Sequence, residues 1–189
     1  MESFELQYML KQKISSRIRI TFDPQKMEKS SKKNIRYYQK YAFLVAETLK
    51  EPLFQKFLHR IIKNENMKID KIGDIQIKIF PFKKENGNRL AGKCNKKGVI
   101  CIYPKGVRFC QELMINWRED TVKFYIQYRA RATLVHEVLH IKYLGKEFTV
   151  RELTRKYFKD FVRIKNLDTN KQIILKKIFP KTNLKELAR

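Results

Sequence analysis

The stretch LVHEVLHIKYLGKEFTVRELTRKYF (residues 134–158) holds two histidines four positions apart, with a glutamate directly after the first. Residues four apart on a helix stand one turn apart on the same face, so His136 and His140 can present ring nitrogens to one ion. Glu137 lies about 100° round the helix, where it can reach a water molecule on that ion. Catalytic zinc keeps one position open and lowers the pKa of its water to about 7, and a glutamate takes the proton. The pattern therefore predicts a zinc-dependent hydrolase.

The residues around the motif predict two consecutive helices. From residue 121 to 143 apolar side chains recur over most of the circumference of a helix, which indicates a largely buried helix. Gly145 marks its end, because glycine tolerates the left-handed backbone angles of a helix terminus. We expect a second helix from about Glu147 to Ile164, folded back onto the first.

Two imidazoles leave a third protein ligand to be found, and the second helix offers two acids. With Val150 at 0° on a helical wheel, Leu153 and the later apolar residues define a buried stripe, and Glu147 falls about 60° away, beside it. Glu152 falls at about 200°, on the opposite side. We therefore expect Glu147 to be the third ligand and keep Glu152 as the alternative.

The rest of the chain indicates a single α+β domain of 189 residues. Residues 34–63 have helical periodicity that Pro52 interrupts, so we expect two helices or one kinked helix. Alternating Ile75, Ile77 and Ile79, and the β-branched run GVICIYP at residues 98–104, predict strands of a small sheet. Residues 74–164 form the predicted core of the domain. Residues 165–189 form a basic C-terminal extension, for which we expect a short docking helix with a loose end.

The charge of the chain suggests a polyanionic partner. It has 43 Lys and Arg against 19 Asp and Glu, a formal net charge of +24. Such an imbalance attracts nucleic acid but does not define a fold. A basic nucleic-acid-binding protein with a structural or inactive zinc site is therefore the alternative to a peptidase that acts on unstructured polypeptide.

Other features of the sequence are expected to be structural. Cys94, Cys101 and Cys110 match no paired-cysteine zinc motif, and each is predicted to be a small buried hydrophobic residue. The third histidine, His59, lies among apolar neighbours in a predicted helix and is expected to pack rather than bind metal. The segment MESFELQYML opens with acids, and no run reaches the roughly 18 apolar residues of a membrane helix, so we expect a cytoplasmic protein without membrane contact.

HEVLH, followed by a glycine turn and a glutamate on the next helix, resembles the gluzincin branch of the zincin metallopeptidases, and the small size of the chain is similar to that of the archaeal minigluzincins. The resemblance covers about residues 74–164. It implies a small, mainly antiparallel sheet packed on the active-site helix and the helix that follows. It also implies that His136, His140 and Glu147 bind zinc and that Glu137 is the general base.

The resemblance further implies an edge strand that binds extended substrate, and Val99, Ile100, Cys101 and Ile102 are similar to it. Substrate would add as an extra strand, which requires unpaired backbone groups on that edge. An oxyanion formed during attack needs a second donor, for which Tyr143 and Tyr157 are the candidates.

The chain also departs from these families. The seven-residue gap from His140 to Glu147 is short for gluzincins. SprT-like proteases, whose work on protein crosslinked to DNA matches the basic charge, use a third histidine after the motif, and none follows His140 here. Peptide deformylase has an aspartate before its second histidine, where this chain has Leu139.

Overall fold

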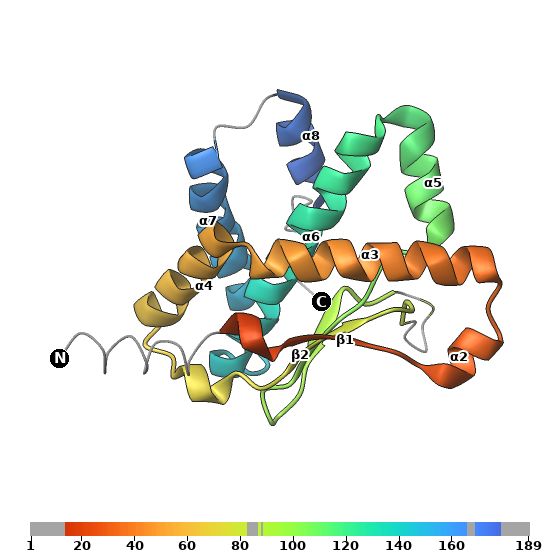
Figure 1. Cartoon of the computed structure of the whole chain (residues 1–189). Coiled ribbons are helices and arrows are strands. Elements are labelled where there is room, and N and C mark those ends of the chain that lie inside the picture. The colour runs from red at the N-terminus through yellow and green to blue at the C-terminus, as the bar shows by residue number, and fades with distance from the viewer. Residues whose placement is uncertain (1–13, 83–86, 88, 166–168, 179–189) are drawn as a thin grey trace.

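The computed structural model describes residues 14–82, 87, 89–165 and 169–178 (Figure 1). The fold combines helices with one small four-stranded sheet, which confirms the α+β class. In chain order the strands and α-helices are β1 (Ile18–Thr21), α2 (Pro24–Glu28), α3 (Lys32–Lys50), α4 (Pro52–Asn64), β2 (Ile75–Lys78), β3 (Gly92–Cys94), β4 (Ile100–Ile102), α5 (Val107–Asn116), α6 (Glu119–Lys142), α7 (Glu147–Lys165) and α8 (Thr169–Ile178).

The sheet has the strand order β1-β2-β4-β3. β1 pairs with β2 and β2 pairs with β4 in parallel, and only β3 and β4 are antiparallel. The expectation of a mainly antiparallel sheet is therefore wrong. The reason lies in the connections between the strands. The chain between β1 and β2 forms α2, α3 and α4, and a long helical crossover of this kind joins parallel strands. The turn at Asn95–Gly98 between β3 and β4 is short enough for an antiparallel hairpin.

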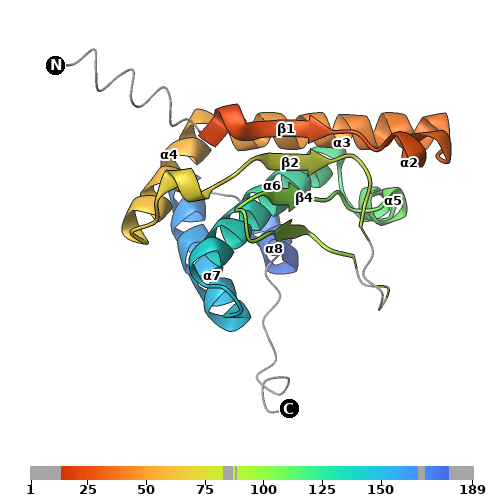
Figure 2. The same cartoon turned by 90° about the horizontal axis from the view of Figure 1, so that it is seen from below.

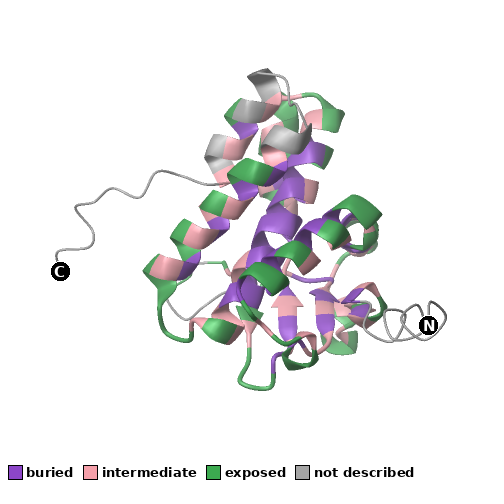
Figure 3. Cartoon of the chain, turned by 90° about the vertical axis from the view of Figure 1, so that its left-hand side faces the viewer, coloured by how far each residue is buried: buried purple, intermediate pink, exposed green. Residues whose placement is uncertain are grey.

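One face of the sheet forms the core. The register aligns Ile18, Ile75 and Ile100 across the three parallel strands, and all three side chains are buried. Helix α3 contacts β1 and β2, and helix α6 contacts β3 and β4. Figure 3 shows the resulting alternation of buried and partly exposed residues along the strands. The predicted half-buried strand is confirmed for residues 75–78, and Ile79 is buried just beyond its end.

The predicted helical segment is two helices. Pro52 is at the first turn of α4, where its missing amide proton costs no hydrogen bond, and α3 ends just before it. Helix α4 packs against α7 through aromatic rings, with Phe57 and Phe161 centroids 4.7 Å apart. Arg131 of α6 is buried beside this cluster and forms an ion pair with Glu51.

Helices α6 and α7 form the predicted antiparallel hairpin. Gly145 has a φ of 72° in the turn, which is the left-handed conformation predicted for the glycine that ends the first helix. The buried side of α7 is centred on Val150, Thr154 and Phe158, whereas Leu153 is only partly buried, so the stripe is rotated slightly from the one predicted. Thr154 is compatible with burial because its hydroxyl donates to the Val150 carbonyl at 2.7 Å.

The C-terminal extension contains the expected short helix. Helix α8 packs on α6, with Ile174 buried. The predicted loose end, residues 179–189, lies outside the described residues. Sequence reasoning missed β1, α2 and α5, although the alternating IRIT of β1 is a strand signal. In the described parts of the chain, no helix combines the length and the apolar composition that crossing a bilayer requires.

Candidate metal centre

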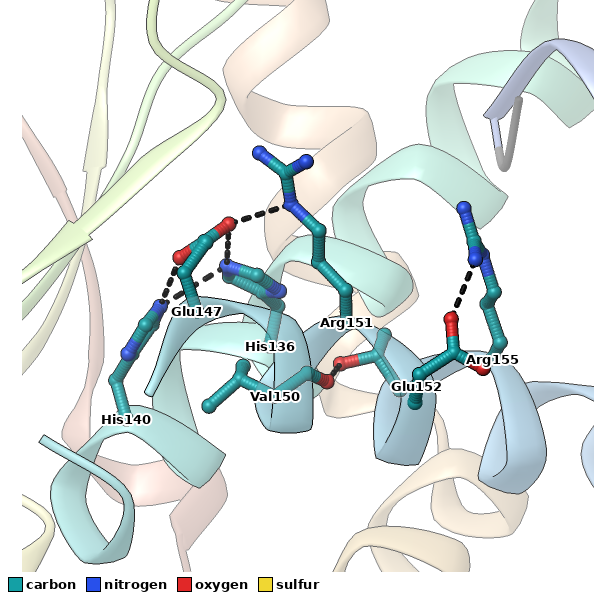
Figure 4. Close-up of polar contacts among 8 residues, drawn as sticks. His136, His140, Glu147, Val150, Arg151, Glu152 and Arg155 are labelled. Carbon is teal, nitrogen blue, oxygen red and sulfur yellow. Dashed lines mark hydrogen bonds and ion pairs between the residues drawn. The ribbon is translucent and has the colours of Figure 1, made fainter. Parts of the chain in front are cut away.

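Three predicted ligands converge where α6 meets the first turn of α7. His140 Nε2 lies 3.1 Å from His136 Nε2 and 3.0 Å from Glu147 Oε2, and His136 Nε2 lies 3.6 Å from Glu147 Oε1 (Figure 4). Among the described residues, these three side chains form the one group of His, Cys, Asp and Glu whose spacing could hold a metal ion. The two histidines come from successive turns of α6, and the Gly145 turn brings Glu147 over them.

The donor set and its spacing suit a tetrahedral ion. Zinc bonds of about 2.0–2.1 Å place neighbouring ligand atoms of a tetrahedron about 3.3 Å apart. The three separations of 3.1, 3.0 and 3.6 Å lie on both sides of that value. Two imidazoles and one carboxylate are a set that catalytic zinc uses, with a fourth position left open. The side chains of His136 and His140 are 23% and 20% exposed, so the cluster is partly open to solvent.

The two candidate glutamates of α7 point in different directions. Glu147 faces the histidines, and its Oε1, the oxygen nearer His136, accepts a hydrogen bond from Arg151 Nε at 2.7 Å. Glu152 lies on the other side of the helix and pairs with Arg155 at 2.5 Å (Figure 4). The structure thus brings Glu147, and not Glu152, to His136 and His140.

The charge states of these groups suit metal binding, which requires neutral histidine and ionised carboxylate. Burial lowers the pKa of His136 to about 4, outweighing the opposite effect of Glu147, so the ring is neutral at pH 7. Partial burial alone would raise the pKa of Glu147, but the hydrogen bond and the positive charge of Arg151 lower it below its ordinary value.

Glu137 is held beside the cluster by the edge of the sheet. Its side chain is buried against β3, and burial raises its pKa to about 7 even though the Cys94 backbone amide donates a hydrogen bond to it. Gly92 makes this approach possible: a β-carbon there would lie 2.8 Å from Glu137 Cγ and 2.6 Å from Thr133 Cγ2. A lone glycine in a strand is a known signal of close backbone approach, and sequence reasoning did not use it.

The two tyrosines proposed as oxyanion donors have another partner. Tyr143 and Tyr157 donate to the two carboxylate oxygens of Glu65, at 2.7 and 2.5 Å, and Lys142 Nζ lies 3.0 Å from the same group. The structure therefore assigns both hydroxyls to a buried carboxylate at the end of α4 rather than to the histidine cluster. Sequence reasoning missed Glu65, which carries no motif.

The predicted substrate-binding strand is not at an edge. Residues 100–102 form β4, which pairs with β2 on one side and with β3 on the other. The backbone groups of Ile100, Cys101 and Ile102 are therefore already hydrogen-bonded within the sheet. Val99 donates its amide to the Asn95 side chain in the adjoining turn. The edge next to Glu137 is β3. The sequence predicts a short strand between turns in the segment that contains β3, but no local pattern shows that this strand, rather than β4, lies at the edge of the sheet.

The side chains of the remaining histidine and of the cysteines are not among the possible metal ligands. His59 Nδ1 lies 2.8 Å from the Gln55 carbonyl one turn earlier in α4, as expected for a packed residue. Cys110 is buried as predicted, but Cys94 and Cys101 are only partly buried, because they lie on the exposed side or edge of the sheet; all three are free thiols.

Comparisons of the chain with protein-family models, with curated proteins and with solved structures found no match.

Proposed function

We propose that this protein is a zinc-dependent peptidase. The observation that carries the proposal is the convergence of His136, His140 and Glu147, whose ligand atoms all lie within 4.8 Å of one another, beside the buried Glu137. A metal-binding cluster with an additional carboxylate next to it is an arrangement that can hydrolyse an amide bond.

Each residue has a defined role in this proposal. His136, His140 and Glu147 would hold the ion, and Arg151 would keep the Glu147 carboxylate in place. The bound ion would supply a water of lowered pKa and polarise the scissile carbonyl. Glu137, whose pKa of about 7 matches neutral conditions, takes the proton from the nucleophilic water and later gives it to the leaving amine.

The substrate in this proposal is an extended polypeptide bound along β3. Ala91 and Asn95 form backbone hydrogen bonds with residues 103 and 99, on the β4 side of the strand. Because the backbone groups of successive residues in a strand point to opposite sides, the N–H and C=O of Gly92 point away from β4. Among the described strands, none pairs with that outer side. A peptide that added there would lie next to Glu137, because the outward-facing Cys94 amide already reaches it.

The test combines metal analysis with a cleavage assay on an unfolded protein such as reduced casein. Wild type should bind one zinc per chain and cleave, whereas Glu137→Gln should bind zinc and not cleave. Absence of stoichiometric metal would refute the proposal.

The alternative is a nucleic-acid-binding protein with a structural or inactive zinc site, which the net charge of +24 favours. A wild-type protein that binds zinc and nucleic acid but cleaves no polypeptide under any metal loading would support it. A peptidase recruited to DNA-bound protein, as in the SprT-like enzymes, would show both activities.

A further inference from the structure

The sheet has a second face, which α3 and α6 do not cover. The side chains that alternate with the buried isoleucines along each strand point to this second face. In Figure 2 the strands lie in front of α6, so the second face is turned toward the viewer. All of these side chains are at least partly exposed. We call this surface the open face; its side chains are Arg19, Thr21, Gln76, Lys78, Lys93 and Cys101.

We propose that the open face binds single-stranded nucleic acid. Its cations are Arg19 on β1, Lys78 on β2 and Lys93 on β3, so they are spread across the sheet rather than clustered. With strands about 4.8 Å apart, the outer two cations are separated by about 14 Å. The four strands contain no acidic residue. A row of cations of this kind follows a phosphate backbone.

The ends of the strands extend the cationic surface. Lys96 and Lys97 are exposed in the β3–β4 turn, at the end of the sheet where β2 and β4 begin. The acids nearest to the strands in sequence are Asp74, directly before β2, and Asp23, two residues after β1. Asp23 caps α2 and forms an ion pair with Lys26 at 3.5 Å. Among the side chains of the open face itself, none is acidic.

Aromatic rings lie at the opposite end of the sheet. Tyr103 directly follows β4 and its ring lies 5.4 Å, centroid to centroid, from that of Phe82, which follows β2 and is 39% exposed. Phe22, directly after β1, is 54% exposed. The three segments lie at the same end of the sheet because β1, β2 and β4 are parallel. Exposed rings beside a cationic surface provide stacking positions for unpaired bases.

The combination favours a single strand over other polyanions. A duplex hides its bases within the stack, so the rings would have no partner, and an acidic peptide has no bases to stack. Gln76, at the centre of the face, accepts a hydrogen bond from Lys78 Nζ at 2.7 Å through its amide oxygen, and its NH₂ group can donate to acceptors of a ligand. The open face also lies across the sheet from Glu137, so binding there does not require the metal centre.

The test measures binding of a fluorescent single-stranded oligonucleotide of about 16 nucleotides to full-length protein at several salt concentrations. Arg19→Glu/Lys78→Glu/Lys93→Glu should weaken binding more than tenfold and reduce the log–log salt slope by about 2. Phe82→Ala/Tyr103→Ala should weaken binding about 5–100-fold with an unchanged slope. Circular dichroism and thermal unfolding verify that each variant is folded.

The matched control carries the same charge change elsewhere. Lys40→Glu/Lys56→Glu/Lys159→Glu alters exposed residues of α3, α4 and α7 and should stay within about threefold of wild type. Glu137→Gln should bind as wild type does, which separates this inference from the proposed peptidase. An equal loss in the control variant, tighter binding of a duplex of the same length, or equal binding of polyglutamate would each overturn the inference.

Discussion

The backbone of Gly92 lies against Glu137 so closely that a β-carbon at Gly92 would stand 2.8 Å from Glu137 Cγ. The strand and the helix can approach this far only without a side chain at that position. As a result the Cys94 amide reaches the Glu137 carboxylate, and that carboxylate is buried with its pKa raised to about 7. The sheet edge thereby determines the environment of the proposed general base.

Gly92→Ala should therefore disturb both stability and catalysis. Overpacking at this contact is expected to cost about 1–3 kcal/mol in the free energy of unfolding, measured by urea denaturation. Cleavage should fall while zinc content stays the same, because the nearest atoms belong to Thr133 and Glu137 rather than to the ligands. Adding Thr133→Ser removes the closest clash and should restore part of the stability. An alanine variant as stable as wild type would show that the helix and strand are not in this close contact.

Removal of Glu147 should release the metal. Glu147→Ala takes away one of three ligands, so the loss of zinc affinity should exceed the 10–100-fold that loss of an outer hydrogen-bonding partner usually costs. Glu152→Ala should keep wild-type affinity, because Glu152 pairs with Arg155 on the other side of α7. The measurement is zinc competition with a chromophoric chelator. The reverse ranking of the two variants would assign the third ligand to Glu152.

Glu137→Gln should abolish turnover without loss of zinc. A positioned general base contributes about 10²–10⁴-fold to rate, and glutamine keeps the shape of the side chain but cannot take a proton. The assay is cleavage of a quenched fluorescent peptide by protein of verified zinc content. Glu152→Gln, the matched change on the far side of α7, should leave the rate unchanged. Retained activity in Glu137→Gln would exclude Glu137 as the base.

Glu65→Gln should destabilise the fold in a pH-dependent way. Burial alone would raise the pKa of Glu65, but hydrogen bonds from Tyr157 and Tyr143 and the charge of Lys142 hold it below its ordinary value. A carboxyl whose folded-state pKa is lowered stabilises the protein above its unfolded-state pKa and loses that contribution as the pH falls through the folded-state pKa. We expect a loss of about 1–3 kcal/mol at pH 7.

The measurement is chemical denaturation of wild type and Glu65→Gln at pH 7 and at about pH 3.5, below the ordinary glutamate pKa. The difference between them should shrink at the lower pH. Glu112→Gln is the control, since Glu112 is 58% exposed in its pair with Arg108 and should contribute little at either pH. A difference that stays constant with pH would show that the charge on Glu65 is not what stabilises the cluster.

Several elements could be predicted because their signals are local. The 3.6-residue period predicted α6 and α7, Pro52 divided α3 from α4, and Gly145 marked the turn between the metal-site helices. The spacing of His136 and His140 places them on one helix face wherever that helix packs. The helical wheel favoured Glu147 over Glu152 for the same reason, since the buried stripe of α7 must face α6.

What the sequence by itself determined was thus the α+β class and the residues that α6 and α7 could present to an ion, because helix geometry is fixed within a few residues. Only the tertiary structure decided the parallel pairing of the sheet and the internal position of β4. It also decided that Tyr143 and Tyr157 donate hydrogen bonds to Glu65, which lies 78 and 92 residues away from them along the chain. These outcomes depend on which distant segments come into contact. Strand pairing and buried hydrogen bonds are selected by the packing of the whole core, and no local period in the sequence encodes that choice.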